Sequence, residues 1–208
     1  MNRKVIFICI LLWIVYSQLN AQSWSIGVEG GPTWSRINAE SVENETSRFG
    51  YQLKLWINKS LGKRTLLQTG LQFITQGAVN ERLFRQNETV KWEYNFSYFN
   101  MPFELRYNIH DNINLGGGLY AGLLTGFNVS REATFSNSLN TPDRSNLQSH
   151  DLGYLLRVAF SLNPISVCLN YQHSFVELPK SNLAQQLIPG ARNSSIQLFV
   201  GYTLFQTK

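Results

Sequence analysis

Apolar and polar residues alternate along much of this chain with the period of two that a β-strand requires. In the clearest stretch, 99–107, the apolar series Phe99, Met101, Phe103, Leu105 and Tyr107 is interleaved with Asn100, Pro102, Glu104 and Arg106. The same alternation recurs in seven more segments, 24–35, 49–58, 65–76, 113–127, 154–162, 165–172 and 196–204. The pattern therefore predicts an all-β protein of eight strands, each with an apolar face and a polar face.

The lengths of the connections predict how these strands are joined. Three links are tight and centre on 62–63, 110–112 and 163–164, whereas the links that alternate with them are long and polar, at 37–48, 77–91, 128–149 and 177–192. Outer-membrane barrels have short periplasmic turns and longer outer loops. An even number of strands also lets the sheet close, so that no strand edge faces lipid. We therefore predict an eight-stranded antiparallel up-and-down transmembrane β-barrel with both termini in the periplasm.

Alternation alone does not separate this barrel from a soluble periplasmic barrel, whose apolar face would line a cavity for an apolar ligand. Glycines share the phase of the charged and amide residues, as a crowded polar lumen requires. Aromatic residues gather near strand ends, as in membrane girdles, and these are Trp34, Tyr51, Phe73, Tyr98, Phe99, Tyr107, Phe127, Tyr171 and Tyr202. The membrane barrel is the favoured interpretation, and the soluble one stays an alternative.

Two local features modify this picture. Tyr94, Phe96 and Tyr98 fall in the opposite phase to 99–107, which predicts a β-bulge at the outer rim. The segment 177–192 contains enough apolar residues, among them Leu187 and Ile188, to pack across the barrel mouth or to dock a partner. The long loops are therefore the candidates for contact with partners, since their residues are not needed for the wall, and capping of the barrel by these loops is the interpretation that the sequence favours.

The first residues have the composition of a signal peptide. Arg3 and Lys4 precede an apolar run at 5–16, and a more polar stretch ends at Ala21. The run is too short for a membrane anchor, because twelve residues span about 18 Å as a helix against a hydrocarbon core of roughly 30 Å. We expect residues 1–21 to be removed and residues 22–208 to form the barrel domain.

The charge of the mature chain is modest. Removal of Arg3 and Lys4 leaves Lys+Arg 16 against Asp+Glu 13, so the formal net charge falls from +5 to +3. The basic residues are scattered singly, unlike the patches of nucleic-acid-binding proteins. The expected partner is the lipid bilayer of the outer membrane, with a protein at the extracellular loops as a further candidate, and no binding of nucleic acid is expected.

Five charged residues share the polar phase and should face the lumen: Glu29, Lys54, Glu104, Arg106 and Arg157. A barrel of eight strands is filled by its own side chains, and an unpaired buried charge costs several kcal/mol. We therefore predict an ion-pair network in the lumen, with amide partners at Gln68, Gln72, Asn100, Asn170 and Gln172. A gated pathway or a ligand site in the lumen is the alternative.

The segment 97–107 also resembles the strand motif Y-x-x-[IM]-P-x-x-x-[KR]-[YF] of the PorT-like outer-membrane β-barrel domain of Gram-negative bacteria. The Gly-rich stretch 114–122, the opening 27–32, Asp151-Leu-Gly and the junction at 21–22 are similar as well. The resemblance covers essentially the whole mature chain. It implies an outer-membrane location and an eight-stranded barrel, and it brings no catalytic residues. Some relatives are associated with protein secretion.

No motif indicates an enzyme, a cofactor or a metal site. The chain has no Gly-x-Ser-x-Gly sequence, and no Cys or His pair has the spacing of metal ligands. His150, Asp151, Asp143 and Glu177 are polar residues near the outer loops, as in any loop of this kind. The leading hypothesis is a structural or interaction protein of the outer membrane. A narrow transport or secretion-associated component is the second.

Overall fold

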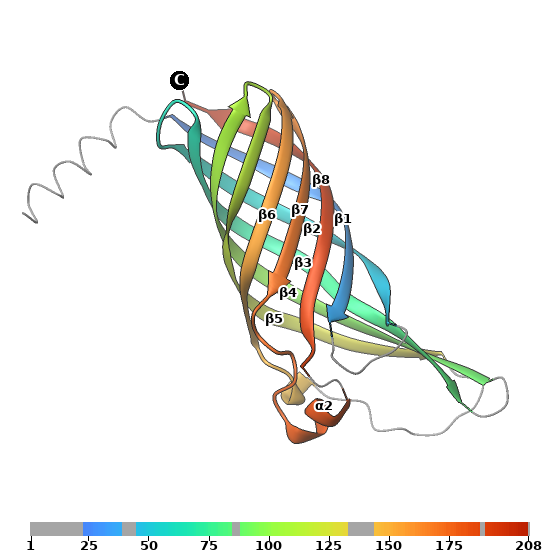
Figure 1. The fold of residues 1–208 in the computed structure, drawn as a ribbon. Coiled ribbons are helices and arrows are strands. Elements are labelled where there is room, and N and C mark those ends of the chain that lie inside the picture. Colours follow the sequence, from blue (N-terminus) through green and yellow to red (C-terminus); the bar gives the residue numbers. More distant parts are fainter. Residues whose placement is uncertain (1–22, 39–44, 85–87, 133–143, 188–189, 208) are drawn as a thin grey trace, which may run out of the picture.

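The chain forms a closed antiparallel barrel in which β8 returns to pair with β1 (Figure 1). The computed structural model describes residues 23–38, 45–84, 88–132, 144–187 and 190–207. The strands are β1 (Trp24–Asn38), β2 (Glu45–Ser60), β3 (Thr65–Phe84), β4 (Glu88–His110), β5 (Ile113–Glu132), β6 (His150–Leu162), β7 (Ile165–Ser174) and β8 (Arg192–Gln206). A 3-10 turn η1 (Arg144–Asn146) and a short helix α2 (Asn182–Leu187) complete the described elements. The predicted fold class is confirmed.

The two faces of each strand meet different surroundings, and the apolar face points outward. In β2, Leu53 and Leu55 are 61% and 49% exposed, whereas Gln52 and Lys54 are each 2% exposed. The same division holds in β4, where Phe103 is 52% exposed and the neighbouring Glu104 is fully buried. A wall that is apolar outside and polar inside suits a lipid environment. The soluble alternative with an apolar lumen is therefore wrong.

The two ends of the barrel differ. One end, here called the turn end, holds the tight links at 61–64, 111–112 and 163–164. Both described chain ends lie there, since the backbone N–H of Trp24 donates a hydrogen bond to Oγ1 of Thr207 at 2.7 Å. The opposite end, here called the loop end, holds α2 and η1 (Figure 1).

The strands at the loop end are longer than the alternation predicts. The expected loop at 77–91 is mostly strand, because β3 and β4 stay paired from Gly77 and Asn95 to Phe84 and Glu88. This hairpin extends well beyond the rim of the barrel (Figure 1). The predicted loops at 37–48 and 128–149 are shortened in the same way by β1, β2 and β5. Beyond the rim neither face of a strand meets lipid, so the sequence there loses its period of two.

The bulge predicted in 93–98 is found in the pairing of β4 with β5, which shifts register between Ser97 and Tyr98, but the extra residue does not belong to β4. β4 pairs with β3 without a register shift, and Phe96 and Tyr98 continue the inward series of Asn100. The irregularity lies in β5, where Gly126 pairs with Ser97 and Leu124 with Tyr98, so that Thr125 is the extra residue. The inner face of β4 therefore becomes aromatic toward the loop end.

Two of the aromatic residues predicted to lie in the membrane girdle, Tyr98 and Phe127, face the lumen instead. Tyr98 is only 1% exposed. The extra residue in β5 reverses the phase beyond it, and Phe127 turns inward to stack on Phe96 with ring centroids 5.1 Å apart. Other members of the predicted girdle, such as Trp34, Tyr51 and Tyr202, are exposed on the outer face. Among the described residues, no helix has the length and apolarity needed to cross a membrane.

Candidate functional site

An ion-pair network fills the centre of the lumen. Lys54 donates a hydrogen bond to Glu104, and its Nζ lies 3.9 Å from Oε2 of Glu29. Arg157 binds Glu29 with both terminal nitrogens, Nη1 being 3.1 Å from Oε2. The same Nη1 lies 3.7 Å from Oε2 of Glu104. The network thus joins two cations and two carboxylates from β1, β2, β4 and β6.

Strand register brings these four charges together, and because they are buried each one needs a partner of opposite charge. Glu29 and Lys54 are direct neighbours in the β1–β2 ladder, and Arg157 reaches them from β6. All four side chains are 2% exposed or less. Each buried charge would cost several kcal/mol alone, and mutual pairing with hydrogen bonds offsets that cost.

Arg106, the fifth predicted member, lies apart from the other four. Its Nε and Nη2 donate to Oδ1 of Asn114 at 3.0 and 2.7 Å, and its Nη1 donates to Oε1 of Gln68 at 3.3 Å. No carboxylate of the described residues lies within 4.0 Å of it. The structure therefore brings four of the five charges together and places Arg106 among neutral amides.

A second polar group, on the loop-end side of the charges, consists of glutamines. Gln72 donates to Gln52 and, at 3.4 Å, to Gln197. Gln197 donates to Oε1 of Gln172 at 2.8 Å. Gln52 and Gln197 were not singled out from the sequence, although both fall in the inward phase. Of the predicted amide partners, Gln68, Gln72 and Gln172 make such bonds, whereas Asn100 and Asn170 line the lumen without one.

An apolar plug closes the loop end. It contains Ile37, Ile74, Phe96, Tyr98 and Leu124 from the strands, together with Leu147 and Leu178 from the connecting segments. Backbone hydrogen bonds hold these segments across the mouth, from the N–H of Gln148 to the carbonyl of Leu178 at 2.9 Å and from the N–H of Leu178 to the carbonyl of Ala191 at 2.8 Å. Segment 177–192 packs across the mouth through Leu178, Pro179 and Ala191, as one of its two predicted roles requires. Leu187 and Ile188, which the prediction names, lie outside the described side chains, and docking of a partner stays a prediction.

The polar residues considered for catalysis do not assemble. Asp151 points into the lumen, where Ser174 and Tyr120 donate hydrogen bonds to it. His150 is exposed, and Glu177 pairs with Arg192 at 3.1 Å. Asp143 lies outside the described residues. In the described part of the chain, no three His, Cys, Asp or Glu side chains are grouped so that they could hold a metal ion.

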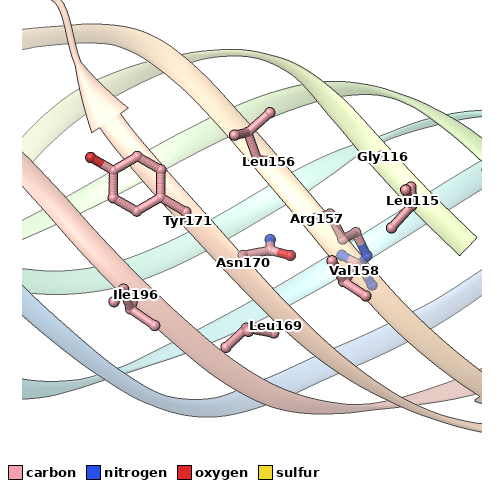
Figure 2. Close-up of a pocket in the computed structure, with 9 residues that line it drawn as sticks. All are labelled: Leu115, Gly116, Leu156, Arg157, Val158, Leu169, Asn170, Tyr171 and Ile196. Atoms are coloured by element: carbon pink, nitrogen blue, oxygen red, sulfur yellow. The ribbon is translucent and has the colours of Figure 1, made fainter.

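The wall carries a hollow of about 400 Å³ between β5, β6, β7 and β8. Figure 2 shows its lining, which is largely apolar and comes from Leu115, Leu156, Val158, Leu169, Ile196 and Tyr171, with Gly116, Arg157 and Asn170 beside them. Five of these side chains belong to the exposed apolar surface of the barrel. The hollow is thus continuous with the lipid-facing wall.

The comparisons with known proteins agree with this architecture. The model of the outer membrane protein beta-barrel domain family matches residues 17–178, and the chain belongs to this family. It is an outer-membrane β-barrel protein of the Gram-negative type. Comparison with curated protein sequences finds no match.

Solved structures of outer-membrane proteins are similar to it. Neisserial surface protein A superimposes with a TM-score of 0.54 at 10% identity, over 88% of this chain and 99% of that one. Ail, the attachment invasion locus protein of Yersinia pestis, solved with the heparin analogue sucrose octasulfate, gives 0.48 at 12% identity, over 88% and 98%. OprG of Pseudomonas aeruginosa gives 0.37 at 10% identity, over 88% and 95%. The similarity to the Neisserial protein establishes a shared fold.

Proposed function

We propose that this protein is a closed barrel that serves the outer membrane as a structural or interaction protein, with its loop end as the contact surface. The observation that carries the proposal is the filled lumen. The ion-pair network occupies its centre, and the apolar plug covers the loop end. An eight-stranded barrel leaves no further room for a water channel.

The loop end is proposed to face the outside of the cell. Barrels of this class have short turns on the periplasmic side and longer loops outside. Residues 1–21, which lie outside the described residues, are proposed to be the signal peptide that directs the chain across the inner membrane. On this orientation the exposed Lys180 and the exposed pair Arg192–Glu177 face a partner at the cell surface.

Sidedness and contact are tested together with single cysteines in a C168S background. Lys180→Cys places a thiol at the loop end, and Lys63→Cys is the matched control at the turn end, both positions being exposed. In intact cells, a maleimide too bulky for porins should label only K180C. A photo-crosslinker on K180C should then capture a neighbouring envelope component, and the same reagent on K63C should not. Labelling of K63C alone would contradict the orientation, and no cross-link from K180C would leave only the structural role.

Within the family, we propose that the chain is PorT-like and has no enzymatic activity. The motif at 98–107 supports the first point, because its Arg106 binds Asn114, the first residue of the Gly-rich stretch that also resembles that group. The second point is supported by the scattered placement of His150, Asp151 and Glu177.

A further inference from the structure

Among the predicted lumenal cations Lys54, Arg106 and Arg157, only Arg106 is bound by no carboxylate of the described residues. Its side chain is buried, with 5% exposed. Asn114 and Gln68 accept three of its hydrogen bonds, whereas a guanidinium carries five N–H donors. Two donors are therefore left without a protein acceptor in the described chain.

The neighbours of Arg106 hold it in place without neutralising it. The amide nitrogen of Asn114 donates to Oγ of Ser161 at 3.2 Å, which turns the Asn114 oxygen toward the guanidinium. The four-residue network of Glu29, Lys54, Glu104 and Arg157 sums to zero formal charge. With Arg106 these five charges sum to +1, and Asp151, a further buried carboxylate of the described lumen, lies nearer the loop end, where Ser174 and Tyr120 donate to it. In a low dielectric the local positive charge at Arg106 attracts a counter-ion strongly.

A cavity of about 210 Å³, here called the turn-end vestibule, lies beside this guanidinium. Polar side chains line it together with Arg106, among them Asn58, Asn108, Asn114, Ser161 and Thr203. Glu29 and Asp111 line it as well, but Glu29 is bound by Arg157 and Lys54, and Asp111 is exposed in the turn. At about 30 Å³ per water, the volume corresponds to roughly seven waters, which is room for a small solvated anion.

We propose that the turn-end vestibule binds a small oxoanion of the phosphate class, with Arg106 as its fixed cation. Guanidinium groups match the oxygen geometry of such anions. The surrounding amides and hydroxyls offer further donors, and the vestibule opens at the end that the proposed orientation gives to the periplasm. The site is separate from the loop-end contact surface and does not depend on the proposed function.

The test is the binding of inorganic phosphate to the folded barrel in maltoside detergent, measured by calorimetry. Wild type and the matched control Arg64→Gln, an exposed arginine at the same end, should bind saturably. Arg106→Gln should lose at least about tenfold in affinity, the scale of one charge-assisted interaction. Asn114→Asp keeps the arginine but gives it a carboxylate partner, so it should lose affinity as well.

Each outcome decides the proposal. Equal binding by wild type and R106Q, or no saturable binding by wild type, overturns it. If R106Q does not fold, N114D alone decides, since binding at the wild-type level would show that the charge of Arg106 is not used. Repeating the measurement in phosphatidylglycerol nanodiscs identifies the source of the anion. Weaker phosphate binding there assigns the site to a lipid headgroup, and unchanged binding assigns it to a free anion.

Discussion

Lys54 is a buried cation whose stability in the lumen depends on nearby carboxylates. Its ammonium group is bonded to Glu104 and lies 3.9 Å from Glu29, so it contacts both carboxylates of the network. Arg157 is the other cation and binds Glu29 with two nitrogens. Loss of Lys54 would therefore leave Glu104 with only the contact of 3.7 Å to Arg157.

Lys54→Met should destabilise the folded barrel by about 3–5 kcal/mol, the typical effect of removing one partner from a buried pair. The measurement is reversible urea unfolding in detergent micelles. Lys63→Met, at an exposed turn position, is the control and should stay within about 0.5 kcal/mol of wild type. The double variant K54M/E104Q should recover part of the loss, because the uncompensated carboxylate is removed. An unchanged stability of K54M would show that the network does not stabilise the barrel.

At this scale the sequence predicts where side chains point better than which groups they meet. Glu29, Lys54, Glu104, Arg106 and Arg157 all face inward, as the period of two requires. Their partners depend on the tilt and register of strands that are distant in sequence. Arg157 meets Glu29 across 128 positions of the chain, whereas Arg106 meets Asn114 only 8 positions away.

In β5, the backbone of the neighbouring strand comes so close that one position requires glycine, whereas the position before it does not. A Cβ at Gly118 would lie 1.9 Å from the carbonyl oxygen of Phe103 and 2.8 Å from Cα of Glu104. Both obstacles are backbone atoms of β4, so they cannot move aside as a side chain would. At the adjacent Gly117 the nearest atoms would be 3.6 Å away, which is ordinary contact.

Gly118→Ala should therefore cost roughly 1–3 kcal/mol of unfolding free energy, as overpacking does elsewhere. Gly117→Ala is the matched control one position along the same strand. It should be neutral or stabilising by up to about 1 kcal/mol, because alanine reduces the freedom of the unfolded chain. Equal effects at both positions would contradict the close approach of β4 and β5 at Gly118.

The plug provides the second test among the elements. Leu178→Ala removes a buried side chain that joins the segment after β7 to the strands, and such truncations cost about 2–5 kcal/mol. Limited proteolysis of the folded protein should then cut segment 175–191 at least about tenfold faster, because the segment opens locally. Lys180→Ala, at an exposed position of the same segment, should be cut at the wild-type rate. Equal rates for L178A and wild type would mean that this residue does not hold the plug.

The alternation of residues in 93–98 does not reveal which of the two paired strands contains the bulge. Inward aromatic residues at Tyr94, Phe96 and Tyr98 have two explanations, a bulge in their own strand or a change in the character of the inner face. A bulge and a change in the inner face would produce the same order of apolar and polar residues in the sequence. The extra residue is Thr125 of β5, and its position depends on pairing with β4. It leaves Leu124 facing inward and turns Phe127 inward as well.

The molecule as a whole is a barrel whose lumen has distinct layers. The turn end contains Arg106, which amides bind and no carboxylate does, and the centre contains the neutral four-residue network. The loop end contains Asp151 and, beyond it, the apolar plug. Strand number, closure and the orientation of both faces follow from the alternation and the link lengths. The plug does not, because it is built from loop segments whose packing has no period.

Single-channel recording in planar bilayers measures directly whether these layers close the lumen. The protein must first show the shift in gel mobility between boiled and unboiled samples that marks a folded barrel. Folded wild-type protein should then give no steady current above that of the bare membrane. Discrete conductance steps of constant size from the same preparation would contradict the closed barrel and would favour the narrow transport component instead.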